Sequence, residues 1–305
     1  MDIIVLLQQA VLNHASDIFV VAGLPVSYRA NGRICREKEE KLMPPQTKEC
    51  VEELYKLAGG RDIRVLEEKG DDDFSFAVPG LSRFRVSAYK QRGALSAVIR
   101  VITFELPEPN EIGIPDPVMS FYNLSKGLVL VTGPAGSGKS TTLACLVDKI
   151  NHSMEKHIIT LEDPIEYLHR HDKSIVSQRE INVDTESYVN ALRASLRQSP
   201  DVILLGEMRD HETIQTAMTA AETGHLILSS LHTTGAANTI SRIMDVFEPS
   251  QQHQIAIQLS MVLQTVISQQ LVPDVNGHNI PVFEIMRLTP AIRNMIRDNK
   301  IYQID

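Results

Sequence analysis

The feature that most constrains this chain is an uninterrupted phosphate-loop pattern. Gly133-Pro134-Ala135-Gly136-Ser137-Gly138-Lys139-Ser140 fits G-x-x-x-x-G-K-[ST] without a mismatch. An apolar run, residues 127–132, precedes it, and a helical pattern, residues 141–150, follows it. A strand, a glycine loop and a helix in this order bind anions, because backbone N–H groups and the positive end of the helix dipole meet there. The pattern predicts a nucleoside triphosphate site, in which Lys139 reaches the β- and γ-phosphates and Ser140 places its hydroxyl on Mg²⁺.

Length and charge narrow the class of protein. A chain of 305 residues is long enough for about two domains of ordinary size. The net charge of −8 argues against sequence-independent binding of nucleic acid, which needs a basic surface. No apolar run approaches the roughly 18 residues that span a bilayer, and residues 1–10 lack the pattern of a cleavable signal. We therefore expect a cytoplasmic protein that does not insert into the membrane.

The cysteine pattern gives no sign of a disulfide framework or a zinc site. Cys35, Cys50 and Cys145 are widely spaced and form no C-x-x-C pair.

Residues 1–102 show the pattern of an α+β domain. Apolar residues at helical spacing predict an amphipathic first helix. Short apolar runs separated by turn residues, including a tight turn at Asn31-Gly32, predict an antiparallel sheet. The expected helices are 2–13, 45–57 and 61–69, and the expected strands lie within 15–34 and at 74–78, 83–91 and 94–102.

A proline-rich segment, residues 103–117, predicts an interdomain linker. Its four prolines and three glutamates suit a segment that neither continues a helix nor joins a sheet. In residues 118–305, apolar runs alternate with helical patterns, which predicts a mostly parallel sheet with helices on both faces. The expected strands are 128–132, 158–161, 175–177, 202–205 and 226–231, and the expected helices include 251–271 and one that Thr289-Pro290 opens.

Acidic residues follow two of these strands. Glu207 comes after the strand at 202–205, with Gly206 where a metal-facing Asp often stands, so Glu207 is the candidate for supporting Mg²⁺. Glu162, Asp163 and Glu166 follow the strand at 158–161. Carboxylates at the carboxyl ends of parallel strands project into the ligand crevice, and one of them can orient and deprotonate the attacking water. The spacing does not decide which of the three does so.

Two histidines flank a further apolar strand. His225 stands at its beginning and His232 at its end, so they cannot form one metal-binding face. His232 lies at the carboxyl end, where it could sense the γ-phosphate; a structural hydrogen-bonding role is equally open for each histidine on residue type alone.

These motifs together resemble the ATPases that power type IV pili and type II secretion. The resemblance rests on the phosphate loop, on Leu161-Glu162-Asp163-Pro164-Ile165-Glu166-Tyr167, on Gly206-Glu207-Met208-Arg209-Asp210, and on the stretch from Thr223-Gly224-His225 to His232-Thr233-Thr234. It covers nearly the whole chain. Within the family, residues 291–298, Ala-Ile-Arg-Asn-Met-Ile-Arg-Asp, are similar to a signature of the pilus retraction motors.

The resemblance implies a fold, an assembly and roles for residues. It implies a PAS-like domain over residues 1–102 joined to a RecA-like P-loop ATPase domain over residues 118–305, in a homohexamer with ATP at the subunit interfaces. The motor would work at the cytoplasmic face of the inner membrane, on a pilus platform protein. Glu166 would be the general base, and arginines of the first domain would bind developing phosphate charge.

The site residues expected on these grounds form three sets. The catalytic set is Lys139, Glu166, Glu207, His232 and the arginines Arg83, Arg85, Arg92 and Arg100. The nucleotide-binding set is Gly133, Pro134, Ala135, Gly136, Ser137, Gly138, Lys139, Ser140, Thr141, Glu162, Asp163 and His225. Ser140 and Glu207 form the Mg²⁺ set.

The resemblance implies an ATP-hydrolysing motor that drives type IV pilus retraction and twitching motility, and three other functions compete with it. A pilus-assembly or type II secretion ATPase is disfavoured because those relatives carry a paired C-x-x-C zinc element that this chain lacks. An adaptor that binds ATP without turning it over is disfavoured by the intact Lys139, Ser140, Glu166 and Glu207. A nucleic-acid translocase is disfavoured by the acidic charge and by an aromatic content of only 5%.

Overall fold

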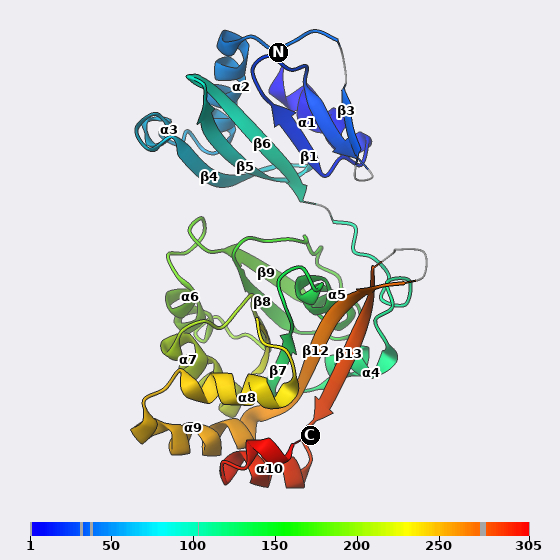
Figure 1. Cartoon of the computed structure of the whole chain (residues 1–305), viewed down its shortest axis with the longest axis vertical. Helices are drawn as coiled ribbons and strands as arrows, with labels where there is room; N and C mark the ends of the chain where they lie inside the picture. Colours follow the sequence, from blue (N-terminus) through cyan, green and yellow to red (C-terminus); the bar gives the residue numbers. More distant parts are fainter. Residues whose placement is uncertain (1, 31–32, 37–38, 103, 275–278, 305) are drawn as a thin grey trace. The chain divides into compact units, whose positions relative to one another are not determined.

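The chain folds into two compact units, Met1–Phe104 and Glu105–Asp305 (Figure 1). The computed structural model describes residues 2–30, 33–36, 39–102, 104–274 and 279–304. The tight turn predicted at Asn31-Gly32 lies outside the described residues.

The first unit is an antiparallel sheet with helices on one face. Six strands lie in the order β3-β2-β1-β6-β5-β4, each antiparallel to its neighbour. The α+β architecture predicted from the alternating pattern is confirmed. Its elements are α1 (Ile3–Leu12), β1 (Asp17–Val20), β2 (Ser27–Ala30), β3 (Arg33–Arg36), α2 (Pro44–Leu57), α3 (Arg64–Lys69), β4 (Asp71–Val78), β5 (Ser82–Gln91) and β6 (Ala94–Ile102).

The two faces of this sheet differ in chemistry. Ile18, Phe84 and Ile99 are fully buried in a core shared with residues of α1 and α2. Since successive side chains of a strand point to opposite faces, Arg85 and Arg100, each next to a core residue, lie on the other face. The first unit therefore carries arginines on the sheet face that its own helices do not cover.

The second unit is a mostly parallel sheet with helices on both faces, as predicted. Seven strands lie in the order β13-β12-β7-β11-β10-β8-β9, and only β13 runs antiparallel to its neighbour. The strands are β7 (Gly127–Thr132), β8 (His157–Glu162), β9 (Ile175–Glu180), β10 (Val202–Leu205), β11 (Leu226–Leu231), β12 (Leu263–Pro273) and β13 (Asn279–Arg287). The helices are α4 (Asp116–Met119), η1 (Ser120–Asn123), α5 (Lys139–Ser153), α6 (Tyr188–Ser195), α7 (His211–Glu222), α8 (Ala236–Asp245), α9 (Pro249–Val262), α10 (Pro290–Arg297) and η2 (Ile301–Gln303).

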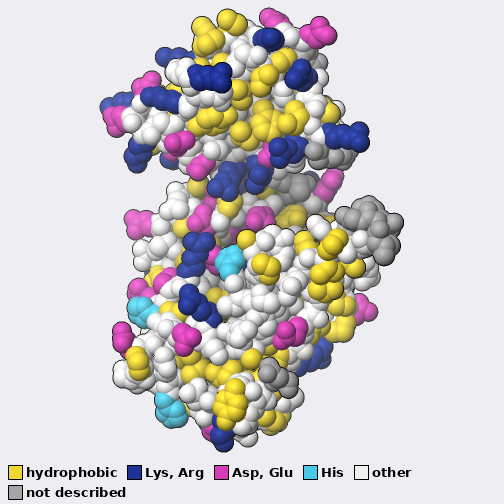
Figure 2. Space-filling model, in the orientation of Figure 1, with side chains coloured by type: hydrophobic (Ala, Val, Ile, Leu, Met, Phe, Trp, Pro, Cys, Tyr) yellow, Lys and Arg dark blue, Asp and Glu magenta, His cyan; other side chains and the backbone are white. Residues whose placement is uncertain are grey.

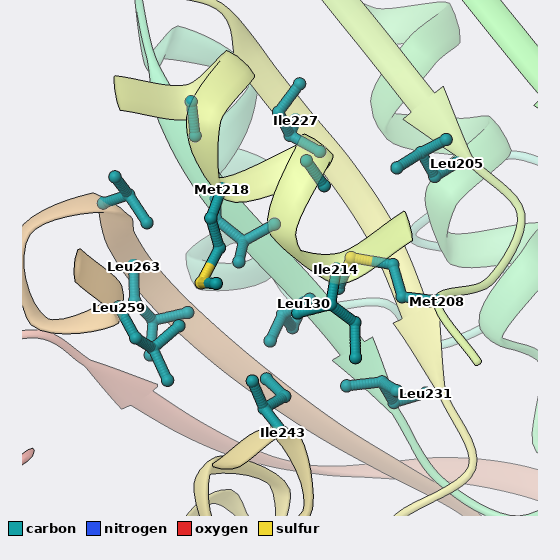
Figure 3. Packing of buried hydrophobic residues seen from close by; sticks show 14 of the residues in the cluster. Leu130, Leu205, Met208, Ile214, Met218, Ile227, Leu231, Ile243, Leu259 and Leu263 are labelled. Carbon is teal, nitrogen blue, oxygen red and sulfur yellow. The ribbon is translucent and has the colours of Figure 1, made fainter. Parts of the chain in front are cut away.

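Two apolar clusters hold this sheet between its helices. One contains Ile214, Met218 and Ile243 from α7 and α8, packed on Leu130 of β7 (Figure 3). The other packs α5 and α4 against the opposite face. Because both faces of the sheet are covered, every residue of β7, β10 and β11 is buried, and these strands show no alternation of apolar and polar residues. On the face of this unit that Figure 2 shows, acidic and basic side chains are interspersed.

The predicted helix over residues 251–271 is wrong in its second half. The helix α9 ends at Val262, and Leu263 begins β12, which pairs with β7 and β13. Three β-branched residues in a row, Thr265-Val266-Ile267, are fully buried there. A continuous apolar run fits a buried helix and a buried strand equally well, and the pairing partners decide between them. The sequence analysis assigned no element to β13.

From Glu105 onward the proline-rich segment belongs to the second unit, and Ile114 joins its core. Ile114 is 2% exposed and belongs to the cluster that packs on α5, and Asp116–Met119 form the short helix α4. The last predicted helix is confirmed: Thr289 caps α10, with its side chain accepting a hydrogen bond from the Ile292 N–H at 3.2 Å. Within the described residues, no helix is long and apolar enough to cross a membrane.

Candidate functional site

The phosphate loop joins the end of β7 to the start of α5. Gly133 has φ +145°, and a Cβ there would lie 2.0 Å from the backbone oxygen of Gln269. Gly138 has φ +87° and directly precedes the helix. Both positions require glycine, one for space and one for backbone conformation. The loop therefore turns tightly directly before the N-terminal end of α5, a helix of 15 residues, where an anion can bind.

Lys139 lies buried beneath this loop. Its residue is 7% exposed, and Nζ donates to the backbone oxygens of Gly133 at 2.9 Å and Pro134 at 2.8 Å. Burial lowers the pKa of the Lys139 ammonium. Nζ is also 3.5 Å from Nδ1 of His232, so the structure brings these two predicted residues together.

Glu162 ends β8 and is the most desolvated acid of the site. Its Oε1 accepts hydrogen bonds from the Thr160 hydroxyl at 2.6 Å and from Nε2 of Gln178 at 3.3 Å. Burial raises the pKa of the Glu162 carboxyl. Asp163 and Glu166 follow in the loop after β8, where both side chains are exposed. Glu166 is therefore free to face a water molecule, whereas Glu162 is fixed in place.

Glu207 follows β10 and lies between two basic groups. Its side chain is 14% exposed, with Oε1 2.7 Å from Nε of Arg209 and Oε2 3.4 Å from Nε2 of His232. Position 206, next to Glu207, has little space for a side chain, because a Cβ there would lie 2.7 Å from the Tyr188 hydroxyl. The site thus holds a tyrosine where a metal-facing aspartate is common, and burial raises the pKa of that tyrosine.

One cavity of about 190 Å³ brings Glu162, Glu207 and His232 together; Lys139 and the loop glycines are not part of its lining. It opens where the carboxyl ends of β8, β10 and β11 meet, as expected for a parallel sheet. The predicted residues that line it are Ser140, Glu162, Asp163, Glu166, Glu207 and His232. A larger cavity, of about 550 Å³, lies between residues 106–110, η1 and α5 and contains none of the predicted site residues.

The sequence analysis missed four residues of this site. Arg209 and Tyr188 line the cavity. Tyr167 lines it too, and its hydroxyl is 3.0 Å from Oγ1 of the predicted Thr141. Gln269 lies against the phosphate loop. Tyr167 and Arg209 stand inside the motifs already quoted, so proximity in sequence could have found them. Tyr188 and Gln269 come from distant elements and carry no local signal.

His225, which the sequence analysis placed in the nucleotide-binding set, does not line this cavity. It precedes β11, at the opposite end from His232, and its Nδ1 is 2.9 Å from the backbone oxygen of Ala220. A strand of six residues separates the two histidines. In this chain His225 stabilises the turn between α7 and β11.

The four predicted arginines all belong to the first unit, and three of them share one sheet face. Arg85 of β5 and Arg100 of β6 are partners in register, and Arg83 lies two residues before Arg85 on the same face. Nε of Arg100 is 3.2 Å from Oδ1 of Asp17. Arg92 differs, since it stands in the turn after β5 with φ +49°.

Arg29 is a further arginine of this face that the sequence analysis missed. It lies opposite Asp17 in register, at 3.9 Å between Nη1 and Oδ2. The face therefore carries Arg29, Arg83, Arg85 and Arg100, of which Arg29 and Arg100 contact Asp17.

The donor set of the cavity suits Mg²⁺. Among the described residues no three His, Cys, Asp or Glu side chains form a group that could hold a metal ion by themselves. Mg²⁺ does not need such a cage, since it binds through one or two protein oxygens, substrate phosphates and water. The Ser140 hydroxyl and the Glu207 carboxylate line the same cavity and are hard oxygen ligands of this kind.

Known proteins with similar sequences and structures are secretion and pilus ATPases. Residues 2–300 match the family described as type II/IV secretion system protein. The type IV pilus retraction ATPase PilT of Pseudomonas aeruginosa is 45% identical over 304 residues, which cover 100% of this chain and 88% of the relative. A twitching motility protein of Neisseria gonorrhoeae is 46% identical over 243 residues, covering 79% of this chain and 65% of the relative. A crystal structure of the pilus retraction motor PilT with bound ADP matches with a TM-score of 0.90 at 46% identity, covering 100% of this chain and 88% of that chain.

Proposed function

This chain belongs to the type II/IV secretion system protein family, and we propose that it is an ATP-driven motor that retracts type IV pili. The chain is an ATPase with a RecA-like fold in its second unit. Hydrolysis is supported by one observation above all: Ser140, the last residue of the phosphate-loop motif, lines a single cavity together with Glu166 and Glu207. Retraction, rather than another output of the family, is supported by the similarity to PilT, which extends over the whole of this chain and 88% of the relative.

The geometry supports a division of work among the residues of the second unit. The backbone N–H groups of the phosphate loop and the ammonium of Lys139 hold the triphosphate. Glu166, exposed at the cavity, accepts a proton from water as the water oxygen attacks the γ-phosphorus. The bond between the γ-phosphorus and the β-phosphate oxygen then breaks, and ADP and phosphate leave.

Mg²⁺ would be held by the Ser140 hydroxyl and, directly or through water, by Glu207. The ion supplies positive charge that offsets the negative charge of the phosphates. Arg209 and His232, which now contact the two oxygens of Glu207, keep that carboxylate at the cavity.

The arginine face of the first unit is proposed to complete the site in a homohexamer. Arg83, Arg85 and Arg100 lie together on it, and a guanidinium binds phosphate oxygens bidentately. Arg92, in the turn, is the fourth candidate. The residues 1–102 form the PAS-like domain of this proposal, and the ring acts on a platform protein at the cytoplasmic face of the inner membrane.

The first experiment compares ATP hydrolysis by the wild type, Glu166→Gln and the matched control Glu155→Gln. Glu155 is exposed in the turn before β8, outside the cavity. We expect Glu166→Gln to lower kcat by about 10²- to 10⁴-fold, because it removes the general base, while ATP still binds. Glu155→Gln should behave as the wild type. Near-zero and equal rates for all three proteins, with ATP bound, would instead identify a nucleotide-gated adaptor.

The second experiment tests the direction of the motor by deleting the gene and counting pili. Loss of a retraction motor leaves cells with excess pili and without twitching. Loss of an assembly motor leaves cells without pili, and that result would overturn retraction while leaving the ATPase assignment intact.

A further inference from the structure

We propose that strand β12 positions the catalytic site from both of its faces, with Gln269 setting the phosphate loop and Ser268 setting the loop that carries His232. The inference rests on the proposed ATP site and assigns roles to residues outside every motif of the sequence. Both are positioning residues, since they act through the loops they contact.

Gln269 is a buried amide beneath the first turn of α5. The residue is 3% exposed, and its Oε1 accepts a hydrogen bond of 2.7 Å from the hydroxyl of Thr142, which is itself fully buried. Thr142 is the third residue after Lys139 in the same helical turn. A buried amide is unfavourable unless it is hydrogen-bonded, so this contact fixes the position of α5 relative to β12.

Gln269 also limits the space available at both ends of the phosphate loop. Its backbone oxygen is 2.0 Å from where a Cβ on Gly133 would stand, and its Nε2 is 2.9 Å from where a Cβ on Gly138 would stand. The first and last glycines of the loop are therefore packed on one side chain and its backbone. Interior packing leaves little free space, so a change of shape at position 269 moves the loop.

Ser268, on the opposite face of the sheet, holds the loop that carries His232. Its hydroxyl accepts a hydrogen bond of 2.9 Å from the Gly235 N–H. Its register partner Glu284 accepts one of 2.9 Å from the Ala236 N–H, at the start of α8. Gly235 and Ala236 come directly after the loop of His232, so these two contacts hold the far end of that loop.

The pairing of β12 with β7 makes this arrangement stiff. Ser268 is in register with Thr132, the residue just before the phosphate loop. The two loops are thus tied to adjacent residues of one strand, which point to opposite faces. The phosphate loop binds substrate before and during reaction alike, whereas His232 contacts Glu207 and Lys139 at the reacting end of the cavity. Disturbing Gln269 should therefore raise KM, and disturbing Ser268 should lower kcat.

The test uses full-length Gln269→Leu, Ser268→Ala and the control Gln270→Leu, which changes the exposed glutamine next along the strand. We expect Gln269→Leu to raise KM for ATP about 10-fold and to leave kcat within about threefold of the wild type. We expect Ser268→Ala to lower kcat about 10-fold and to leave KM within about threefold. Gln270→Leu should match the wild type in both. Equal changes of KM and kcat in both variants, or values indistinguishable from the control, would overturn the proposal.

A second route covers the case in which Gln269→Leu does not fold. Thr142→Val removes the hydroxyl that Gln269 accepts from, and Thr142→Ser keeps it. Thr142→Val should raise KM as Gln269→Leu does, whereas Thr142→Ser should have the KM of the wild type. An unchanged KM in Thr142→Val would contradict the role of this hydrogen bond.

The outcome is separable from that of the proposed function. Titration of the wild type with ADP and ATP comes first, and failure of the wild type to bind either one would remove the nucleotide site itself. If the wild type binds nucleotide but Gln269→Leu and Gln270→Leu have the same KM for ATP, only the inference about β12 is overturned.

Discussion

Asp72 in the first unit and Glu162 in the second are both shielded from water, but the groups that bond to them differ in charge. Asp72 of β4 accepts from both Nε and Nη2 of Arg61 at 2.8 Å each, and from the Tyr55 hydroxyl at 2.8 Å. Glu162 of β8 accepts from a threonine hydroxyl and a glutamine amide, and among the described residues no Lys or Arg pairs with it.

The electrostatic results differ accordingly. Burial opposes the ionisation of Asp72, but the hydrogen bonds from Arg61 and Tyr55 outweigh it and lower the pKa of Asp72. Burial raises the pKa of Glu162, and its two neutral donors do not offset this. An acid neutralised within its own unit is structural. An acid left without a cation beside a phosphate loop belongs to a site that is prepared for a charged ligand.

The largest expected effect is on the first of these acids. Asp72→Asn should lower the free energy of unfolding by about 2 kcal/mol, because it weakens hydrogen bonds to a charged group in a buried position. The estimate allows for the Arg61 side chain being 38% exposed, so that water can replace part of the interaction. Denaturant unfolding at pH 7 measures it. The control Asp73→Asn changes the exposed neighbour and should stay within about 0.5 kcal/mol of the wild type; an equal loss in both would remove the contrast.

The same variant should reveal the pH dependence of the Asp72 contribution. The pKa of Asp72 is lowered in the folded state, so between that pKa and the unfolded value of about 3.9 the unfolded chain binds more protons. The stabilisation is complete above about pH 4 and disappears as the pH falls through the folded pKa. The difference in stability between wild type and Asp72→Asn should therefore shrink on acidification below about pH 4. A difference that grows there would contradict the assigned direction.

A smaller effect is expected from the tyrosine that completes the Asp72 site. Tyr55→Phe removes one hydrogen bond and leaves the bidentate contact with Arg61, so it should cost about 1 kcal/mol. Tyr302→Phe serves as the matched control, because Tyr302 is 74% exposed. Thermal unfolding of the two variants side by side would show whether the loss is specific to Asp72.

The smallest expected effect, of opposite sign, is on the second acid. Glu162→Gln should leave the free energy of unfolding at pH 8 unchanged or raise it by less than about 1 kcal/mol, because burial opposes the ionisation of this carboxyl and its hydrogen bonds come only from neutral groups. The raised pKa means that the folded chain binds more protons than the unfolded one above about pH 4.3, so wild-type stability from this group falls as the pH rises from there. A loss of 2 kcal/mol or more, the size expected for Asp72→Asn, would show that Glu162 is structural too.

Much of the site could be predicted because phosphate binding depends on residues adjacent in the chain. Gly133 and Gly138 supply space and backbone conformation, and Lys139 follows within the same turn of chain. The acids after β8 and β10 could also be foreseen, since parallel strands bring their carboxyl ends to one edge. The arginines of β5 and β6 were expected from the family resemblance, and the register of the two strands puts Arg85 beside Arg100.

The sequence by itself determined the phosphate loop, the parallel strands between residues 127 and 231, and the acids that face the ligand, because these follow from local backbone chemistry and from the period of each element. Only the tertiary structure decided that residues 263–273 form a strand, that Tyr188 fills the space beside Gly206, and that Gln269 lies beneath the loop. These features depend on contacts between residues far apart in the chain. Such contacts impose no spacing on the sequence, so no local pattern records them.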